Sequence, residues 1–208
     1  MNIIGFSAGV VGHESNVDRM VKAIMDVTGH ETEFIKLTEL DFSACKGCVW
    51  LCAEPEVCRL DDALFPYYQK VKEADAVVLG SPVHFSTISA TMMAFISRLW
   101  GFRHVNFTLK DKPFVLAVAA GEELRSAPGD FRKALEPFRV KVLHCVQFRS
   151  GIPPCFKCGR HHECRIGGDY HWLGPKAQDL SIVPELFKKW ENCSETVAQI
   201  EEAGAKLK

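Results

Sequence analysis

Short apolar segments that alternate with helical patterns are the feature that most constrains the fold of this chain. Residues 76–80 (AVVLG) and 113–120 (PFVLAVAA) carry no charge, and strands of this kind are covered on both faces, as in parallel sheets. Residues 16–28 instead repeat apolar side chains at helical spacing, namely Val17, Met20, Val21, Ile24 and Met25. The alternation predicts an α/β fold in which helices lie on both faces of a parallel sheet.

The same patterns predict five strands and the helices between them. The expected strands cover residues 2–6, 33–37, 76–80, 113–120 and 141–148. The expected helices cover residues 16–28, 89–99, 131–138 and 183–203, and a further helix, capped by Asp61 and Asp62, ends near residue 73. Residues 151–174 hold two prolines, three cysteines and three histidines, and we expect them to form an irregular loop.

Three parts follow from this pattern. Residues 1–150 form the predicted core, with a cysteine-rich insert at 45–58. Residues 151–174 form a Cys/His-rich loop, and residues 175–208 form a helical segment that packs on the core.

The balanced charge and the many cysteines favour some classes of protein over others. The chain has 25 Lys and Arg against 26 Asp and Glu, so nothing favours nucleic acid or an anionic membrane as a partner. The N-terminus MNIIGFSAGV lacks the features of a signal peptide, and no run of 18 apolar residues occurs. We therefore expect a cytoplasmic protein, in which nine cysteines indicate metal or redox chemistry rather than disulfides.

Three loops are expected to meet at one edge of the sheet, because ligands of open α/β sheets bind outside the carboxyl ends of the strands. The loop 7–16 contains Ser7, Gly9, Ser15 and Asn16 before a helix, an arrangement that suits a phosphate group or simply makes a turn. The other two loops cover residues 81–86 and 120–129.

The second and third loops suit a flat ligand. Pro82 fixes a turn, and Val83, His84 and Phe85 offer an apolar and aromatic edge. Gly121 follows a buried strand at a point where backbone can approach a planar ring. The alternative interpretation places Phe85 in the core and His84 on the surface.

Two cysteine clusters could hold metal. Cys45, Cys48, Cys52 and Cys58 lie within fourteen residues, and four soft ligands select iron-sulfur or zinc; structural or free thiols are the alternative. The second cluster offers a tetrahedral set for zinc or iron-sulfur, with a lid or a disulfide-forming loop as the alternative. Its candidate ligands are Cys155, Cys158, Cys164, His161 and His162.

Several motifs together resemble a known family. They are Ser15-Asn16, Cys45-Lys46-Gly47-Cys48, Asp61-Asp62 and the segment 80–85 (GSPVHF). The combination resembles the flavodoxin-like NADPH-dependent FMN reductases, and among them the iron-sulfur flavoproteins, over roughly residues 1–150. The resemblance implies a five-stranded flavodoxin-like sheet, an FMN phosphate on the first loop, and an FMN site made by Ser7, Gly9, Ser15, Asn16, Val17, Pro82, Val83, His84, Phe85, Ala120, Gly121 and Glu122.

The chain departs from the family pattern at three places. Val17 stands where relatives have a phosphate-binding hydroxyl, and His84 stands where many have tyrosine. Three residues separate the second and third cysteines, Cys48 and Cys52, where relatives have two.

We therefore expect an FMN-dependent oxidoreductase or electron-transfer protein that passes electrons between FMN and a 4Fe-4S cluster at Cys45, Cys48, Cys52 and Cys58. The chemistry belongs to the cofactors, so no catalytic residue is assigned. NAD(P)H, ferredoxin or a quinone would exchange electrons with the protein, and the resemblance implies a homodimer or tetramer. The alternatives are an NAD(P)H-dependent FMN or quinone reductase without a cluster, and a zinc-binding interaction module.

Overall fold

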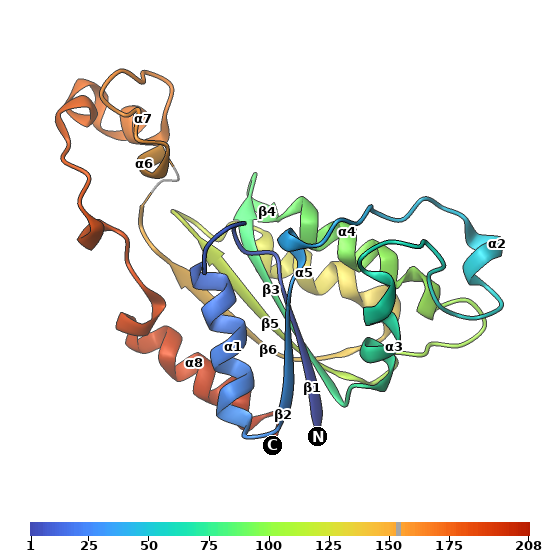
Figure 1. Ribbon diagram of the computed structural model, residues 1–208. Coiled ribbons are helices and arrows are strands. Elements are labelled where there is room, and N and C mark those ends of the chain that lie inside the picture. Colours follow the sequence, from blue (N-terminus) through green and yellow to red (C-terminus); the bar gives the residue numbers. More distant parts are fainter. Residues whose placement is uncertain (153–154) are drawn as a thin grey trace.

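A parallel sheet with strand order β2-β1-β3-β5-β6 forms the centre of the computed structural model, which describes residues 1–152 and 155–208 (Figure 1). The five strands confirm the predicted parallel sheet. A two-residue strand, β4, adds an antiparallel pair with β3 that the sequence did not predict. The strands are β1 (Asn2–Ser7), β2 (Glu31–Lys36), β3 (Ala76–His84), β4 (Thr87–Ile88), β5 (Pro113–Ala120) and β6 (Lys141–Arg149).

Helices cover both faces of the sheet, as predicted (Figure 1). One face packs against α1 (Asn16–Thr28) and α8 (Ser194–Ala205). The other packs against α3 (Phe65–Glu73), α4 (Ala90–Arg98) and α5 (Ala127–Leu135). Successive β3 residues alternate between the two cores, because side chains along a strand point to opposite faces.

Shorter helical segments complete the described chain. Three are α-helical, namely α2 (Val49–Cys52), α6 (Cys155–Cys158) and α7 (Gly168–Leu173). Six are 3₁₀ turns, namely Leu37–Glu39, Leu99–Phe102, Glu136–Phe138, Gly174–Asp179, Pro184–Leu186 and Trp190–Asn192.

Three helices begin at residues other than the predicted ones. α3 begins at Phe65, and its N-cap residue is Leu64, which has no side-chain cap. The Asp62 carboxylate accepts from the Leu64 amide at 3.1 Å and pairs with Arg98. α5 begins at Ala127, ahead of residue 131. α8 begins only at Ser194, because the segment from 183 onward forms two 3₁₀ turns, one of them started by Pro184.

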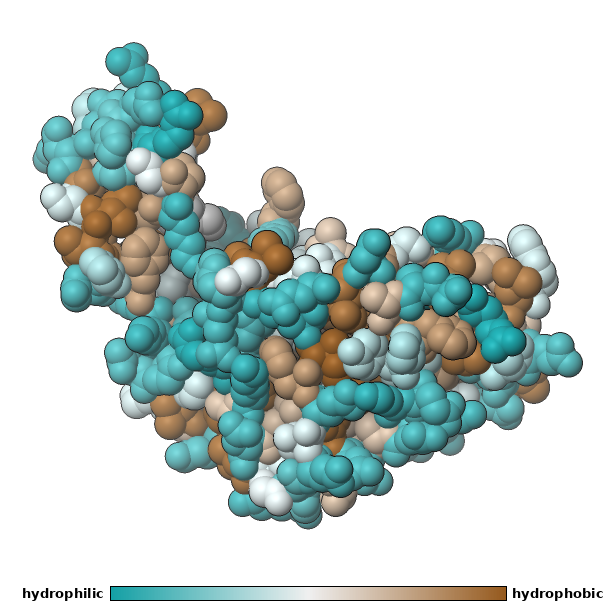
Figure 2. Space-filling model, in the orientation of Figure 1, coloured by the Kyte–Doolittle hydropathy of each residue, from teal (hydrophilic) through white to brown (hydrophobic). Residues whose placement is uncertain are grey.

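Residues 155–183, here called the C-terminal arm, stand off from the sheet and its helices (Figures 1 and 2). The prediction of an irregular loop over residues 151–174 was wrong for α6 and α7, which each form a short helix within it. Pro153 and Pro154 of that loop lie outside the described residues. None of the described helices is both long and apolar enough to cross a membrane. The three-part division of the chain stays a prediction.

The two isolated cysteines should differ in reactivity. Burial raises the pKa of Cys145 to about 11, whereas hydrogen bonds from Thr196 lower the pKa of the half-buried Cys193. Because the thiolate is the nucleophile, we expect iodoacetamide at pH ~8 to alkylate Cys193 in the native protein and to leave Cys145 unmodified. Peptide mass spectrometry measures both, and denatured protein is the control, in which Cys145 must react. Equal labelling of the two thiols in native protein would contradict the burial of Cys145.

Candidate flavin site and cysteine cavity

The first and second predicted loops start from neighbouring strands. β3 lies between β1 and β5, and the amide of Ala8 donates to the Gly80 carbonyl at 2.8 Å. The carboxyl ends of β1, β3 and β5 therefore lie side by side, as the α/β sheet rule requires.

A buried carboxylate, Asp18, organises the first loop. Ser7 Oγ donates to Asp18 Oδ1 at 2.6 Å, and Ser15 Oγ donates to Oδ2 at 2.9 Å. The Ser15 amide also donates to Oδ2 at 2.7 Å, and the Lys36 ammonium lies 3.2 Å from the same oxygen. Gly9 packs so closely on this group that a Cβ there would collide with the Asp18 carboxylate and the Ser15 hydroxyl. Ser7, Gly9 and Ser15 are thus gathered around Asp18.

Replacing Asp18 should show how strongly this network holds the loop. Asp18→Asn removes the charge that Lys36 and two serine hydroxyls satisfy, so we expect the free energy of unfolding to fall by about 2–3 kcal/mol. Asp26→Asn, on the exposed side of the same helix, is the matched control and should stay within about 0.5 kcal/mol of wild type. Urea unfolding measures both. Equal effects of the two substitutions would contradict a central role for Asp18.

The other two predicted residues of the first loop point elsewhere. Asn16 donates to the Lys188 carbonyl at 3.2 Å and accepts from the Trp190 amide at 3.3 Å, so its side chain fastens the segment before α8. Val17 is buried in the core, where its side chain packs beside Gly80.

The end of β3 presents the predicted aromatic edge. Phe85 is fully exposed and has a φ of 50°, and Ser86 follows with a φ of 68°. Left-handed backbone at an aromatic residue is strained, and such strain gathers at binding sites. His84 is also exposed, while Pro82 and Val83 are half-buried. The alternative in which Phe85 belongs to the core was wrong.

The third loop follows β5 beside this edge. Ala120 is buried, and Gly121 and Glu122 are half-buried. The amides of Ser150 and Ile152 donate to the carbonyls of Ala120 and Gly121, both at 3.0 Å, so this stretch is held against the end of β6. Burial, together with repulsion from Glu123, raises the pKa of Glu122.

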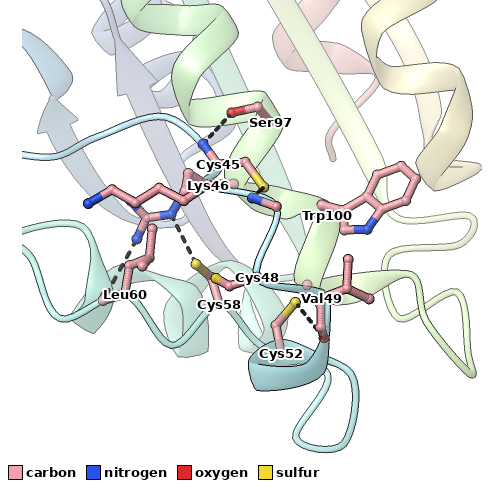
Figure 3. Close-up of a pocket in the computed structure, with 12 residues that line it drawn as sticks. Cys45, Lys46, Cys48, Val49, Cys52, Cys58, Leu60, Ser97 and Trp100 are labelled. Carbon is pink, nitrogen blue, oxygen red and sulfur yellow. Dashed lines mark hydrogen bonds between the residues drawn. The ribbon is translucent and has the colours of Figure 1, made fainter.

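All four cysteines of the first cluster line one cavity of about 360 Å³. Figure 3 shows their sulfurs turned toward the same space. Cys52 and Cys58 are buried, Cys48 is half-buried and Cys45 is exposed. Burial raises the pKa of Cys52, and the nearby thiols of Cys58, Cys48 and Cys45 raise it further. The four cysteines of the motif therefore line one cavity, but no three of them are arranged to share a metal ion in the described part of the chain, so their role as ligands stays a prediction.

Arg98, at the end of α4, is a buried charged residue in the wall of this cavity. Its guanidinium Nε donates to Cys58 Sγ at 3.0 Å. Its two terminal nitrogens donate to the Asp62 carboxylate at 2.6 and 3.1 Å, and one also reaches the Ser43 carbonyl at 2.7 Å. The Arg98 side chain is fully buried and the Asp62 side chain is 16% exposed. Arg98 thus connects Cys58 to Asp62 and Ser43.

Low pH should weaken the ion pair between Asp62 and Arg98. Burial alone would raise the pKa of Asp62, but hydrogen bonds and attraction from Arg98 outweigh it and hold the pKa below its ordinary value. A carboxyl with a lowered pKa stabilises the fold above its unfolded pKa of about 4 and loses that effect as pH falls. We expect urea unfolding of the wild type to weaken more between about pH 5 and pH 3 than that of Asp62→Asn. Parallel pH profiles of the two proteins would contradict this.

Three further contacts shape the cavity. Cys52 Sγ lies 3.0 Å from His104 Nε2. A Cβ on Gly101 would lie 2.6 Å from the Cys58 amide nitrogen, so only glycine lets the turn Leu99–Phe102 pack against the cysteine segment. The Cys45 amide also donates to Ser97 Oγ at 3.1 Å.

Sequence reasoning missed the residues that complete the cavity wall. They are Ser97, Arg98, Trp100, Gly101 and His104. One signal was present, because Arg98 is the only charged residue of an otherwise apolar or neutral helix (ATMMAFISR). A charge on such a helix is buried only with a partner, but the sequence does not identify the partner.

The second cluster lies in the C-terminal arm. Cys155 and Cys158 are one helical turn apart on α6. Cys155 and Cys164 are half-buried and Cys158 is exposed. His161 is buried with Nε2 at 2.7 Å from the Leu180 carbonyl oxygen, and the ring of the exposed His162 packs edge-on against it. Across residues 1–152 and 155–208, no three His, Cys, Asp or Glu side chains are already arranged to share one metal ion.

Comparison with known proteins decides the family. Residues 1–152 match the model of the NADPH-dependent FMN reductases. This chain belongs to that family. Within the family it is similar to an iron-sulfur flavoprotein of Archaeoglobus fulgidus, with 32% identity over 74% of each chain. An iron-sulfur flavoprotein of Methanocaldococcus jannaschii is 35% identical over 54% of this chain, and the match spans only 58% of that relative.

Solved structures agree on the fold of this family member. An FMN-dependent NADH-azoreductase from Bacillus anthracis, solved with FMN, superposes with a TM-score of 0.60 at 13% identity over 99% of this chain and 97% of that one. This likeness shows a shared fold, and the strand order β2-β1-β3-β5-β6 is the flavodoxin-like order that was predicted. The match to the NADPH-dependent FMN reductases makes the chain a flavin-dependent oxidoreductase, as predicted.

Proposed function

We propose that this chain binds FMN at the ends of β1, β3 and β5 and exchanges its electrons with a 4Fe-4S cluster held by Cys45, Cys48, Cys52 and Cys58. The observation that carries the proposal is the cavity into which all four sulfurs turn. FMN would accept or release electrons singly or in pairs, and the cluster would carry one electron at a time.

The loops fit FMN in part. The exposed Phe85 and the half-buried Gly121 lie at the ends of adjacent strands, where a flat ring would cover the apolar surface. Val10 and Val11, which are 43% and 62% exposed, extend that surface from the first loop. The phosphate would meet Gly9, Ser7 and Ser15, although both hydroxyls already donate to Asp18. Backbone amides near the start of α1 would then carry more of the phosphate binding than in relatives.

The cavity fits a cluster by its donors and its surroundings. Four thiols on one wall are the ligand set of a 4Fe-4S cluster. The Gly47 amide donates to Cys45 Sγ at 3.5 Å, and Arg98 donates to Cys58 Sγ. Hydrogen bonds to ligand sulfurs stabilise the thiolate form and tune the potential of a cluster. The Arg98 charge would also offset part of the negative charge that four thiolates bring.

Helix α4 joins the two sites. It begins two residues after β4, close to Phe85, and ends at Arg98 beside the cysteines. Its nine residues give it a length of about 13 Å. The resemblance to iron-sulfur flavoproteins supports electron transfer to the flavin of a neighbouring subunit as well, so we also propose a homodimer or tetramer.

The second candidate function is an NAD(P)H-dependent FMN or quinone reductase without a cluster. The match to NADPH-dependent FMN reductases favours it. Steady anaerobic oxidation of NAD(P)H by iron-free protein, with free FMN or a quinone added as the electron acceptor and at the rate of the iron-loaded protein, would support this candidate. Rapid reduction by ferredoxin, with no oxidation of NAD(P)H, would support the electron carrier.

Composition after anaerobic purification tests the proposal. Flavin, iron and acid-labile sulfide are counted per chain, before and after reconstitution with iron and sulfide. We expect one flavin, four irons and four sulfides per chain. Flavin without iron, even after reconstitution, would leave the reductase candidate, and neither flavin nor iron would refute both.

A further inference from the structure

The C-terminal arm contains a buried carboxylate that no hydrogen bond satisfies. Asp169 is 2% exposed, and neither of its side-chain oxygens finds a hydrogen-bond partner among the described residues. An unpaired carboxylate that is hidden from water is costly unless a cation or a donor meets it. Arg160 and Arg165, the arginines of the same loop, are both exposed.

Two thiols lie beside this carboxylate. A Cβ placed on Gly167 would lie 2.5 Å from Asp169 Oδ1, 3.3 Å from Cys155 Sγ and 3.4 Å from Cys164 Sγ. The three donor atoms therefore surround the side of Gly167 that has no side chain, and any larger residue there would fill the space. The Gly168 amide donates to Cys155 Sγ at 3.3 Å, a contact that stabilises the thiolate form.

We propose that Asp169 joins Cys155, Cys158 and Cys164 as the fourth ligand of a zinc ion. Zn²⁺ takes four ligands in structural sites, with Zn–S distances of about 2.3 Å and Zn–O distances of about 2.1 Å. The donor side chains would have to draw together to reach these distances, because no three of them are already arranged around one point among the described residues. Cys158 follows Cys155 at i+3 on α6, which places both side chains on one helix face.

Charge and proton balance are consistent with this site. Binding converts three thiols to thiolates and releases their three protons to solvent. Three thiolates and one carboxylate around Zn²⁺ leave a net charge of −2, which Lys157, Arg160 and Arg165 of the same loop can offset. No electron is transferred, so the site needs no oxidant.

His161 and His162 were the histidine candidates expected from the sequence. The buried His161 also has an unpartnered atom, Nδ1, among the described residues. Its ring packs edge-on against Phe156 and His162, with centroids at 6.2 and 4.4 Å. Asp169, in contrast, has its oxygen beside two sulfurs. The geometry therefore favours the carboxylate over the imidazole.

Metal analysis of the full-length protein, purified with a reductant and incubated with zinc, tests the proposal. We expect one zinc per chain in wild type, its loss in Cys164→Ser, and at least tenfold weaker zinc binding in Asp169→Asn. Asp179→Asn, an exposed aspartate of the same arm, is the matched control and should bind zinc like wild type. Iron at the first cysteine cluster should not change in any variant, so failure here is distinct from failure of the proposed electron carrier.

Cobalt(II) substitution and limited trypsin digestion provide readouts other than activity. Sulfur-to-cobalt charge-transfer absorption should appear in wild type and weaken in Cys164→Ser. Zinc should slow cleavage after Lys157, Arg160 and Arg165 in wild type and in Asp179→Asn, but not in Cys164→Ser. Wild type without zinc, unchanged affinity in Asp169→Asn, or loss of zinc in His161→Gln but not in Asp169→Asn would each overturn the proposal. Iron instead of zinc in the arm, seen as less iron in Cys164→Ser, would overturn it as well.

Discussion

Arg98→Met should lower the free energy of unfolding of the iron-free protein by about 3 kcal/mol or more. Methionine keeps much of the length of the side chain but removes the charge that pairs with Asp62 at 2.6 Å. The Asp62 carboxylate would then lie largely buried without its cation, and the Ser43 carbonyl and Cys58 sulfur would each lose a donor. Urea unfolding followed by circular dichroism measures the change.

Arg125→Met is the matched control for this experiment. Arg125 pairs with Glu123, but the two side chains are 61% and 59% exposed, and exposed ion pairs contribute at most about 1 kcal/mol. Arg98→Lys should recover only part of the stability, because an ammonium cannot hold Asp62 and Cys58 in the fixed planar geometry of a guanidinium. A loss in Arg98→Met no larger than in Arg125→Met would show that the buried pair does not hold this wall together.

Cys58→Ser should abolish most of the iron bound by the anaerobically purified protein. A hydroxyl is a much poorer ligand for iron than a thiolate, and Cys58 is the buried ligand that receives the Arg98 hydrogen bond. Iron content and the absorption of iron-sulfur charge transfer measure the loss. Flavin content should change little, since Cys58 lies at the other end of α4 from the loops assigned to FMN.

Cys145→Ser is the control that separates a ligand effect from a general cysteine effect. Cys145 is also buried, but on β6, away from the cavity, so we expect full iron content. Equal iron in Cys58→Ser and wild type would exclude Cys58 as a ligand.

The central strands and the helix α1 could be predicted because the pattern of apolar residues in each indicates the type of element. Residues 113–120 are apolar throughout and form β5 within the same bounds, and the helical spacing of residues 16–28 gives α1. β2 was placed two residues late because Glu31 and Thr32 are exposed on an edge strand. Their pairing with β1 depends on backbone hydrogen bonds that no side-chain pattern reveals.

Some residues of the candidate sites could be predicted from the sequence, and others could not. The four cysteines of the first cluster could be read from their spacing, because fourteen residues suffice to bring them together. The roles of Asp18, Arg98 and Asp169 could not be predicted from the sequence. Each is a charged residue that is buried in the folded chain, and its role depends on the neighbours that the fold places around it. Asp62 was expected to cap a helix, and it does accept from the Leu64 amide just before α3. Its pairing with Arg98 could not be predicted, although a buried arginine needs a carboxylate partner.

The most direct test of the proposed electron carrier is an anaerobic reductive titration of the purified protein, followed by absorption and electron paramagnetic resonance. We predict that wild type takes up one electron more per chain than its flavin alone can hold, and that this electron appears as the signal of a reduced iron-sulfur cluster. Cys58→Ser should not take up that additional electron, but its flavin should still be reduced. Reduction that ends when the flavin is full, with no cluster signal in protein reconstituted with iron and sulfide, would contradict the proposal.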